Sequence, residues 1–172
     1  MPRTVRGHLP DGVYHVTARG VNRCAVYGDD LDRILFLRLL ADNVERFAWR
    51  CHAYCLMGTH YHLLVETIGA RLSAGLHRLN GIYAQRFNRR HDRTGHLFGS
   101  RFHAWVVENE DHLSATTAYV LNNPVRAGMC LTAAEWPWSA PRGAERRRGG
   151  QSEQVFVHPQ GYTGYRWPPT SS

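Results

Sequence analysis

Two histidines stand two residues apart in an apolar stretch, CLMGTHYHLLVE, which runs from Cys55 to Glu66. The stretch is typical of a β-strand, and successive side chains of a strand point to opposite faces. His60 and His62 therefore project from the same face, where two imidazoles can bind one metal ion. Two partly exposed histidines on a polar sheet face would give the same pattern. The pair indicates a metal site only if further ligands join it.

A second candidate pair lies downstream, in DHLSATTAYVLNNPVRAG. Tyr119 and Asn123 are four residues apart and so share one face of a helix. Leu113, Thr117 and Leu121 fall on roughly the opposite side, where they can face the core. Tyr119 and Asn123 could then face the sheet, with the amide oxygen as a third ligand beside a phenol. The alternative is a buried tyrosine and a helix-ending asparagine, and the residues alone favour it slightly.

Elements that could hold these side chains follow from periodicity and from turn and capping residues. Strands are predicted at Gly12–Ala18, Trp49–Met57, His60–Thr67 and Arg101–Glu108. Helices are predicted from Asp29 or Asp30 to about Phe47, from Arg71 to about Arg90, and from Asp111 to about Asn123, where Pro124 should end the last helix. The buried stripes of the first two helices are predicted to be Ile34, Leu37, Leu40, Val44 and Phe47, and Leu72, Leu76, Leu79, Tyr83 and Phe87.

This order, βαββαβ plus a final helix, predicts an α+β fold. We expect a ferredoxin-like split βαβ sandwich, in which an antiparallel sheet has helices on one face and a C-terminal helix carries Tyr119.

Length and composition indicate one globular domain, since 43% of the 172 residues are hydrophobic. We expect this domain at residues 1–140. The segment PRGAERRRGG is typical of a basic linker, so residues 141–172 are expected to form a linker and an irregular tail. The sequence has no run of about 18 apolar residues, so no membrane helix is expected. The first residues also lack the apolar segment of a secretory signal. A cytoplasmic location is expected, with nucleoid association if the partner is DNA.

The charge of the chain favours a polyanionic partner. All 21 basic residues are arginines, and the formal net charge is +7. Arginine pairs with phosphate through a two-pronged fork and stacks on bases. A genome that prefers arginine codons would explain the missing lysines but not the net positive charge.

The four cysteines are more typical of buried thiols than of disulfides in an intracellular chain. Cys51 and Cys55 lie near His52, so a zinc protein is one alternative. No second ligand pair follows at the spacing of a zinc site, which makes zinc the less favoured interpretation.

Five blocks, in order, resemble the single-tyrosine HUH transposases, in particular the insertion-sequence-200-like and REP-associated branch. The blocks are YHVTARGVNR, LMGTHYHLLVE, GHLFGSRFHA, YVLNNPVRAG and EWPWS, and the resemblance covers about Gly12 to Ser139. The HUH motif is a histidine pair around a bulky apolar residue, here Tyr61. The pair Gly58-Thr59 departs from the Pro-Asn that is frequent in relatives, which could alter the turn but spares the ligands.

The resemblance implies a function and a set of roles. His60, His62 and Asn123 would bind a divalent metal, Mg²⁺ or Mn²⁺, and Tyr119 would be the nucleophile. The enzyme would cleave and rejoin single-stranded DNA, expected to form hairpins, through a 5′-phosphotyrosine. It would act as a monomer or a homodimer. A non-catalytic single-stranded nucleic-acid-binding domain is the main alternative, because such modules share the fold class and the charge.

Residues that could contact nucleic acid lie in two places. Asn22 and Arg23 follow the first strand, and a basic track on the second helix and its loop consists of Arg78, Arg86, Arg89, Arg90 and Arg93. A solvated basic helix face is an equally good explanation for each arginine. Tyr14, Phe98 and Trp105 could stack on bases, but we expect all three to pack in the core.

Overall fold

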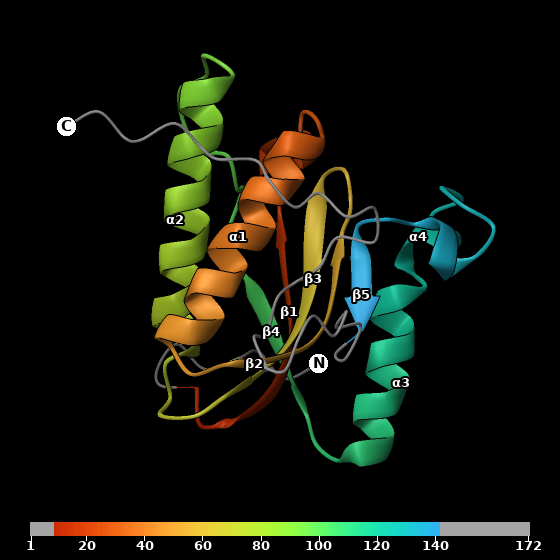
Figure 1. Ribbon diagram of the computed structural model, residues 1–172. Helices are drawn as coiled ribbons and strands as arrows, with labels where there is room; N and C mark the ends of the chain where they lie inside the picture. Colours follow the sequence, from red (N-terminus) through yellow and green to blue (C-terminus); the bar gives the residue numbers. More distant parts are fainter. Residues whose placement is uncertain (1–8, 142–172) are drawn as a thin grey trace, which may run out of the picture.

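Five strands form one antiparallel sheet in the computed structural model, which describes residues 9–141 (Figure 1). The strands are β1 (Gly12–Arg19), β2 (Arg50–Leu56), β3 (His60–Thr67), β4 (His103–Val107) and β5 (Ser139–Pro141). The α-helices are α1 (Asp30–Arg46), α2 (Leu72–Arg90), α3 (Glu110–Leu121) and α4 (Asn123–Arg126), and two short 3₁₀ helices lie at Val21–Arg23 and Ala133–Glu135. Residues 1–8 and 142–172 lie outside the described part, so the linker and tail expected at residues 141–172 lie outside it except for Pro141.

The strand order β4-β1-β3-β2-β5 confirms the ferredoxin-like arrangement and adds β5 at one edge. Because β1 lies between β3 and β4, it faces the histidine strand on one side and the predicted fourth strand on the other. The register pairs Arg19 with His60 and Thr17 with His62, and it pairs His15 with Trp105 on the other side. Residues paired in this way point to the same face of the sheet.

Helices α1 and α2 cover one face of the sheet, where the main hydrophobic core lies (Figure 1). All five residues of the predicted α2 stripe are buried, and the α1 stripe is buried at Leu37, Leu40 and Val44, with Ile34 and Phe47 partly buried against the core. Tyr83 is fully buried, and its hydroxyl donates to the carbonyl of Val26 (2.5 Å). Strand alternation sends Tyr61 and Leu63 into this core and sends the two histidines of β3 to the other face.

Helix α3 packs on that other face, so the helix that carries Tyr119 lies across the sheet from α1 and α2 (Figure 1). It is held by Val120, which is fully buried with Leu64 and Val107 in a second, smaller apolar cluster. The predicted inward stripe of α3 is correct at Leu113, which packs against this cluster, but the buried positions that follow are Thr116 and Val120 instead of Thr117 and Leu121. Tyr119 is therefore next to the sheet-facing residue, at the side of the helix.

The end of α3 also differs from the prediction. The helix stops at Leu121, and Pro124 lies in the first turn of the short helix α4 instead of ending α3. Proline is favoured in a first helical turn because it has no N–H to leave unpaired there. Asn123 thus begins a new helical turn instead of closing the old one.

The EWPWS block packs against β2. The Trp136 indole N–H donates to the carbonyl of Leu56 (3.1 Å), and Leu56 N–H donates to the carbonyl of Trp138 (2.8 Å). Trp138 is buried, and β5 follows directly and pairs with β2. These contacts give the block a structural role at the edge of the sheet.

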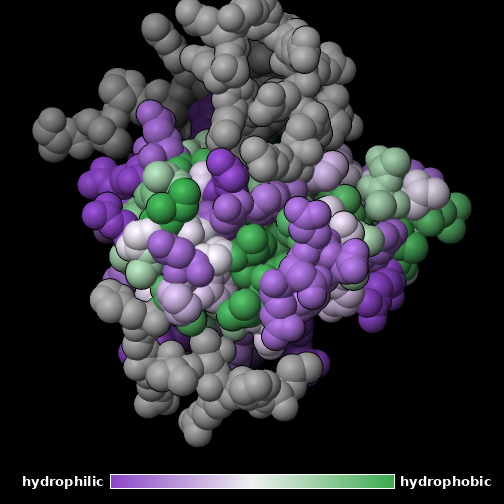
Figure 2. Space-filling model, turned by 90° about the horizontal axis from the view of Figure 1, so that it is seen from below, coloured by the Kyte–Doolittle hydropathy of each residue, from purple (hydrophilic) through white to green (hydrophobic). Residues whose placement is uncertain are grey.

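The surface seen from below carries apolar side chains between hydrophilic ones (Figure 2). Within residues 9–141, no helix has the length and apolar character that crossing a membrane requires.

Candidate active site

Three imidazoles gather on the α3 face of the sheet. His60 and His62 come from β3 and His15 from the neighbouring β1; we call these three side chains the histidine cluster. The rings of His60 and His62 lie 5.0 Å apart, nearly perpendicular, whereas those of His15 and His62 stack at 5.2 Å and 20°. The prediction that His60 and His62 share a face is therefore correct, and the third imidazole comes from a strand that the HYH motif does not contain.

The hydrogen bonds of the cluster use one nitrogen of each HYH ring. His15 Nε2 and His62 Nδ1 are 2.9 Å apart, and the Thr59 hydroxyl lies 3.1 Å from His60 Nδ1. His62 Nε2 is buried and has no partner among the described residues. When His15 and Thr59 accept from the two Nδ1–H groups, both Nε2 atoms carry lone pairs, which is the form that binds metal.

Burial favours the neutral form of all three rings. Desolvation lowers the pKa of His62 to about 3 and that of both His15 and His60 to about 4. The positive charge of Arg19, paired with His60 across the strands, adds to the lowering at His60 and His62. At neutral pH the imidazoles are uncharged and their lone pairs are free of protons, as metal ligation requires.

Tyr119 approaches this cluster from α3. Its ring makes edge contacts with His15 (5.7 Å between centroids) and His62 (6.1 Å), and 41% of the residue is exposed. The guanidinium of Arg126, from α4, lies over the Tyr119 ring at 4.8 Å. The phenol thus stands beside the imidazoles, open to solvent, with a positive charge that could pair with a phosphate.

Asn123 lies one turn beyond Tyr119. Its Nδ2 donates to the carbonyls of Tyr119 (2.9 Å) and Val120 (3.4 Å), so the amide satisfies the free carbonyls at the end of α3. Within the described residues, Asn123 is not hydrogen-bonded to an imidazole. The amide nitrogen is used by the helix, and its Oδ1 is the atom left to act as a ligand.

The chemistry of the donor set fits a divalent metal, although residues 9–141 contain no group of three His, Cys, Asp or Glu side chains placed to hold one. The orphaned, buried Nε2 of His62 is the observation that favours a ligand there, since a buried polar nitrogen without a partner is unfavourable. A complete protein ligand set needs an amide such as that of Asn123.

The zinc alternative does not fit the geometry. A β-bulge between Cys51 and Ala53 shifts the register of β2. Consequently Cys51 packs against the main core and Cys55 against the second apolar cluster, on opposite faces of the sheet. Burial raises the pKa of both thiols to about 12, and the His52 Nε2 pairs with Glu66 (2.9 Å) instead. All four cysteines are free thiols.

Of the predicted nucleic-acid contacts, Asn22 and Arg23 follow a residue at the end of β1 that is bonded to the turn before the histidine strand. Asn22 and Arg23 are exposed and have left-handed backbone angles (φ 50° and 57°). Gly20 N–H donates to the carbonyl of Thr59 (2.9 Å), which ties this turn to the residue before His60. The α2 arginines lie on the other side of the sheet from Tyr119.

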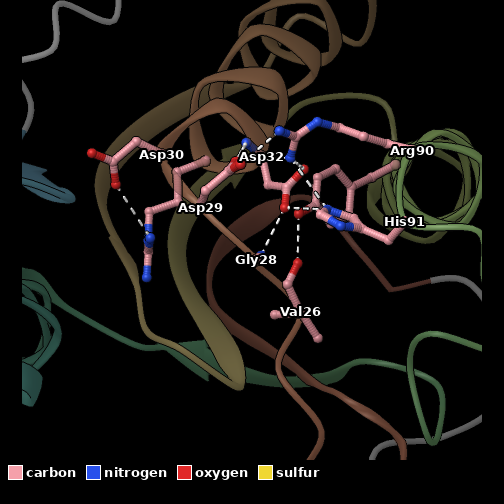
Figure 3. Close-up of polar contacts among 9 residues, drawn as sticks. Val26, Gly28, Asp29, Asp30, Asp32, Arg90 and His91 are labelled. Carbon is pink, nitrogen blue, oxygen red and sulfur yellow. Dashed lines mark hydrogen bonds and ion pairs between the residues drawn. The ribbon is translucent and has the colours of Figure 1, made fainter.

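Several arginines of the predicted basic track have protein partners. Arg90 binds Asp29 through both guanidinium arms (2.6 and 2.8 Å) and also binds the fully buried Asp32 (2.8 Å), which accepts from Gly28 N–H as well (Figure 3). These hydrogen bonds raise the pKa of Arg90. The cluster fastens the start of α1 to the end of α2.

The remaining arginines of the track differ in their surroundings. Arg78 pairs with Asp42 (2.7 Å) and donates to Asn43 (2.6 Å), and Arg93 stacks on Phe87 at 5.7 Å. Arg86 and Arg89 have no acidic partner in the described part of the chain, and Arg89 is exposed.

Comparison with known proteins identifies the family. The family model described as "Transposase IS200 like" matches residues 9–123, which include every residue of the candidate site except Arg126. The chain belongs to the IS200-like transposase family.

Two solved structures are similar to this chain, and the first of them supports the fold. A REP-associated tyrosine transposase bound to a REP hairpin has a TM-score of 0.65 at 16% identity, over 81% of this chain and 82% of that one. A protein from Deinococcus radiodurans described as a transposase has a TM-score of 0.48 at 18% identity, over 71% of this chain and 97% of that one. No curated protein sequence matches.

Three site residues of this IS200-like transposase were missed by sequence reasoning. Residues 15, 17 and 19 of GVYHVTAR are spaced two apart, so the sequence could predict that His15 and Arg19 share a face of the strand. It could not predict which strand would lie beside them. Arg126 follows Pro124, where the sequence predicted the end of a helix. Nothing in the sequence therefore indicated that the Arg126 guanidinium would lie over the Tyr119 ring.

Proposed function

We propose that this IS200-like transposase cleaves and rejoins single-stranded DNA through a 5′-phosphotyrosine on Tyr119. His60, His62 and Asn123 would hold a divalent metal ion beside it. The observation that carries the proposal is the approach of an exposed phenol from α3 to a buried imidazole pair from β3, with 6.1 Å between the Tyr119 and His62 rings. A phenol in reach of solvent and next to unprotonated imidazoles has the placement that a nucleophile beside a metal site requires.

The reaction is a pair of transesterifications. The Tyr119 oxygen attacks the scissile phosphorus and loses its proton, an O–P bond forms, and the bond from phosphorus to the 3′-oxygen breaks. The 3′-oxygen takes up a proton and leaves as a hydroxyl. A second 3′-hydroxyl then attacks the phosphotyrosine, so the backbone is resealed and the phenol is restored. The number of phosphodiester bonds is conserved, and no nucleotide cofactor is needed.

The metal, when bound, would supply Lewis-acid polarisation of the phosphate. The protein side chains provide the rest: two neutral imidazoles offer lone pairs, and the Arg126 guanidinium can neutralise phosphate charge beside the phenol. Imidazole ligands suit transition metals better than Mg²⁺, so we expect Mn²⁺ to bind more tightly.

Hairpin-forming single-stranded DNA is the proposed substrate. The similar REP-associated transposase is bound to a REP hairpin, and the net charge of +7 suits a nucleic acid. Asn22 and Arg23 are the best placed of the proposed contacts, because their turn is tied to the residue before His60. Arg86 and Arg89 would add nonspecific attraction. We further propose a cytoplasmic, nucleoid-associated enzyme that acts as a monomer or homodimer.

The test is the covalent adduct itself. The protein is incubated with Mn²⁺ and end-labelled single-stranded hairpins taken from the flanks of its gene, and a denaturing gel separates a protein–DNA adduct from free DNA. Peptide mapping then locates the modified tyrosine. We expect an adduct on Tyr119 with the wild type and none with Tyr119→Phe.

Two variants make the result specific. Tyr14→Phe removes the hydroxyl of a buried tyrosine outside the site and should leave adduct formation intact. His60→Ala should abolish it. An adduct that persists in Tyr119→Phe would refute the nucleophile, and tight DNA binding without any adduct would favour the non-catalytic binding domain.

A further inference from the structure

Trp105 is an exposed indole beside the candidate active site. Core packing was expected for Tyr14, Phe98 and Trp105, and it is confirmed for Tyr14, which is 1% exposed, and for Phe98, which packs against the main core. It is wrong for Trp105, which is 41% exposed on β4, at the edge of the described sheet. One face of this large aromatic side chain is therefore open to solvent and available to a ligand.

The sheet places this indole in a row of rings that begins at Tyr119. Tyr119 contacts His15 (5.7 Å between centroids), His15 contacts Trp105 (5.4 Å), and Trp105 stacks on His103 (5.9 Å, 23° between planes). The pairing of His15 with Trp105, and of Thr17 with His103, in the β1–β4 register puts these side chains on the α3 face. An exposed aromatic platform, formed by Trp105 and His103, therefore lies one ring away from the proposed nucleophile.

We propose that this aromatic platform stacks with a nucleobase next to the phosphate that reaches Tyr119. The proposal rests on the proposed function for the place of that phosphate. Aromatic side chains stack on the faces of unpaired bases, largely without regard to sequence. A DNA strand whose phosphate reaches Tyr119 would carry its neighbouring bases past the platform. A base in single-stranded DNA is unstacked and available, whereas a base in a duplex is not.

The neighbouring charges suit this occupant. Arg126 lies over the Tyr119 ring, and Arg19 extends from β1 on the same face as the platform. Two cations therefore lie on the face of the sheet that carries the aromatic row, where they can pair with the phosphates of a DNA strand. A purely apolar protein partner would gain nothing from them. By holding one base, the platform would fix the position of the DNA strand along the sheet. That position would determine which phosphate lies next to the Tyr119 hydroxyl.

The experiment measures DNA affinity without chemistry. All variants carry Tyr119→Phe and metal is left out, so no adduct can form. The probes are a short fluorescein-labelled oligothymidine and an abasic oligomer of the same length, which has the same phosphates but no bases. Trp105→Ala should bind the oligothymidine roughly 5- to 150-fold more weakly. It should bind the abasic oligomer as well as its parent does.

Two further variants complete the design. Trp105→Phe keeps an aromatic face and should retain most of the affinity. Val106→Ala, on the same strand but on the opposite face and 51% exposed, should change neither affinity. Thermal unfolding of each variant verifies that the fold is kept.

Three results would overturn the platform: an unchanged oligothymidine affinity in Trp105→Ala, an equal loss for both probes, or an equal loss in Val106→Ala. The readout is independent of the proposed chemistry. If the wild type forms no phosphotyrosine but the base-dependent loss is found, the platform stands and the proposed function fails.

Discussion

Replacing His15 by phenylalanine should weaken metal binding without removing a metal ligand. The rings of His15 and His62 stack at 5.2 Å, and phenylalanine preserves that stack while removing both nitrogens. What it deletes is the 2.9 Å hydrogen bond between His15 Nε2 and His62 Nδ1. His15 lies on β1 and precedes the HYH motif by 45 residues, so its effect is exerted through His62.

The physical reason is the tautomer of His62. A neutral imidazole carries one N–H, and when His15 accepts from Nδ1–H, the lone pair is held on Nε2. That Nε2 is buried and has no partner in the described residues, so it is the nitrogen left to bind a metal. Without the acceptor, the proton can move to Nε2 and block the ligand, and the ring is no longer fixed in orientation.

The expected magnitude is that of losing a partner behind a ligating histidine, about 10- to 100-fold in metal affinity. This corresponds to roughly 1.4–2.7 kcal/mol. Isothermal titration of metal-free protein with Mn²⁺ gives the affinity directly. Long-range ¹H–¹⁵N spectra of the imidazoles report the His62 tautomer, which should change from Nδ1–H to a mixture in His15→Phe.

His103→Phe is the matched control, since His103 lies on the same face and stacks on Trp105 without bonding to His62. It should leave the Mn²⁺ affinity unchanged. His15→Gln, whose side-chain oxygen can accept a hydrogen bond, should recover part of the loss. The reasoning is refuted if His15→Phe binds Mn²⁺ like the wild type. A loss as complete as that of His62→Ala would also refute it, because His15 would then be a ligand itself.

Three further predictions concern stability. Arg90→Ala removes a partner of the buried Asp32 and should lower the free energy of unfolding by about 2–3 kcal/mol in chemical denaturation, whereas Arg89→Ala should change it by less than about 0.5 kcal/mol. Val120→Ala should cost about 2 kcal/mol and loosen α3, measured by amide exchange, while the exposed Val106→Ala should have almost no effect. The histidine cluster has folded-state pKa values of about 3 to 4, below about 6.5 in the unfolded chain, so the unfolded state binds more protons between these limits. Metal-free protein should therefore lose stability as the pH falls from about 6.5 to about 4, and a flat profile would contradict the assigned burial.

Local sequence rules predicted most of the elements, because each depends on neighbours in the chain. The predicted β3, His60–Thr67, has the observed bounds, and the α2 stripe is buried at every predicted position. Alternation along β3 was sufficient to place His60 and His62 on one face. Periodicity gave the correct face for β3 and α2, whereas on α3 the buried positions are Thr116 and Val120 instead of the predicted Thr117 and Leu121.

The failures occurred where two elements determine the result together. The β2 bulge separates Cys51 from Cys55, although alternation over four residues would put them on one face, and no residue in RCHAYCL signals it. Arg90 looked like a phosphate contact because its partners, Asp29 and Asp32, lie 61 and 58 residues away. A charge count along one helix cannot reveal such pairing.

The candidate site combines both situations, and this explains why the sequence identified the two imidazoles of the HYH motif but not the side chains that surround them. The HYH motif defines two imidazoles, but the nitrogen that each presents is decided by Thr59 in the turn and by His15 on β1. Because β1 is the central neighbour of both β3 and β4, its outward residue His15 touches the rings of His62, Tyr119 and Trp105 together. A substitution that removes this ring should disturb the tautomer of the proposed ligand His62, the position of the proposed nucleophile Tyr119 and the aromatic platform at once. A change in His60 should affect only the metal, so comparing His15 and His60 variants separates positioning from ligation.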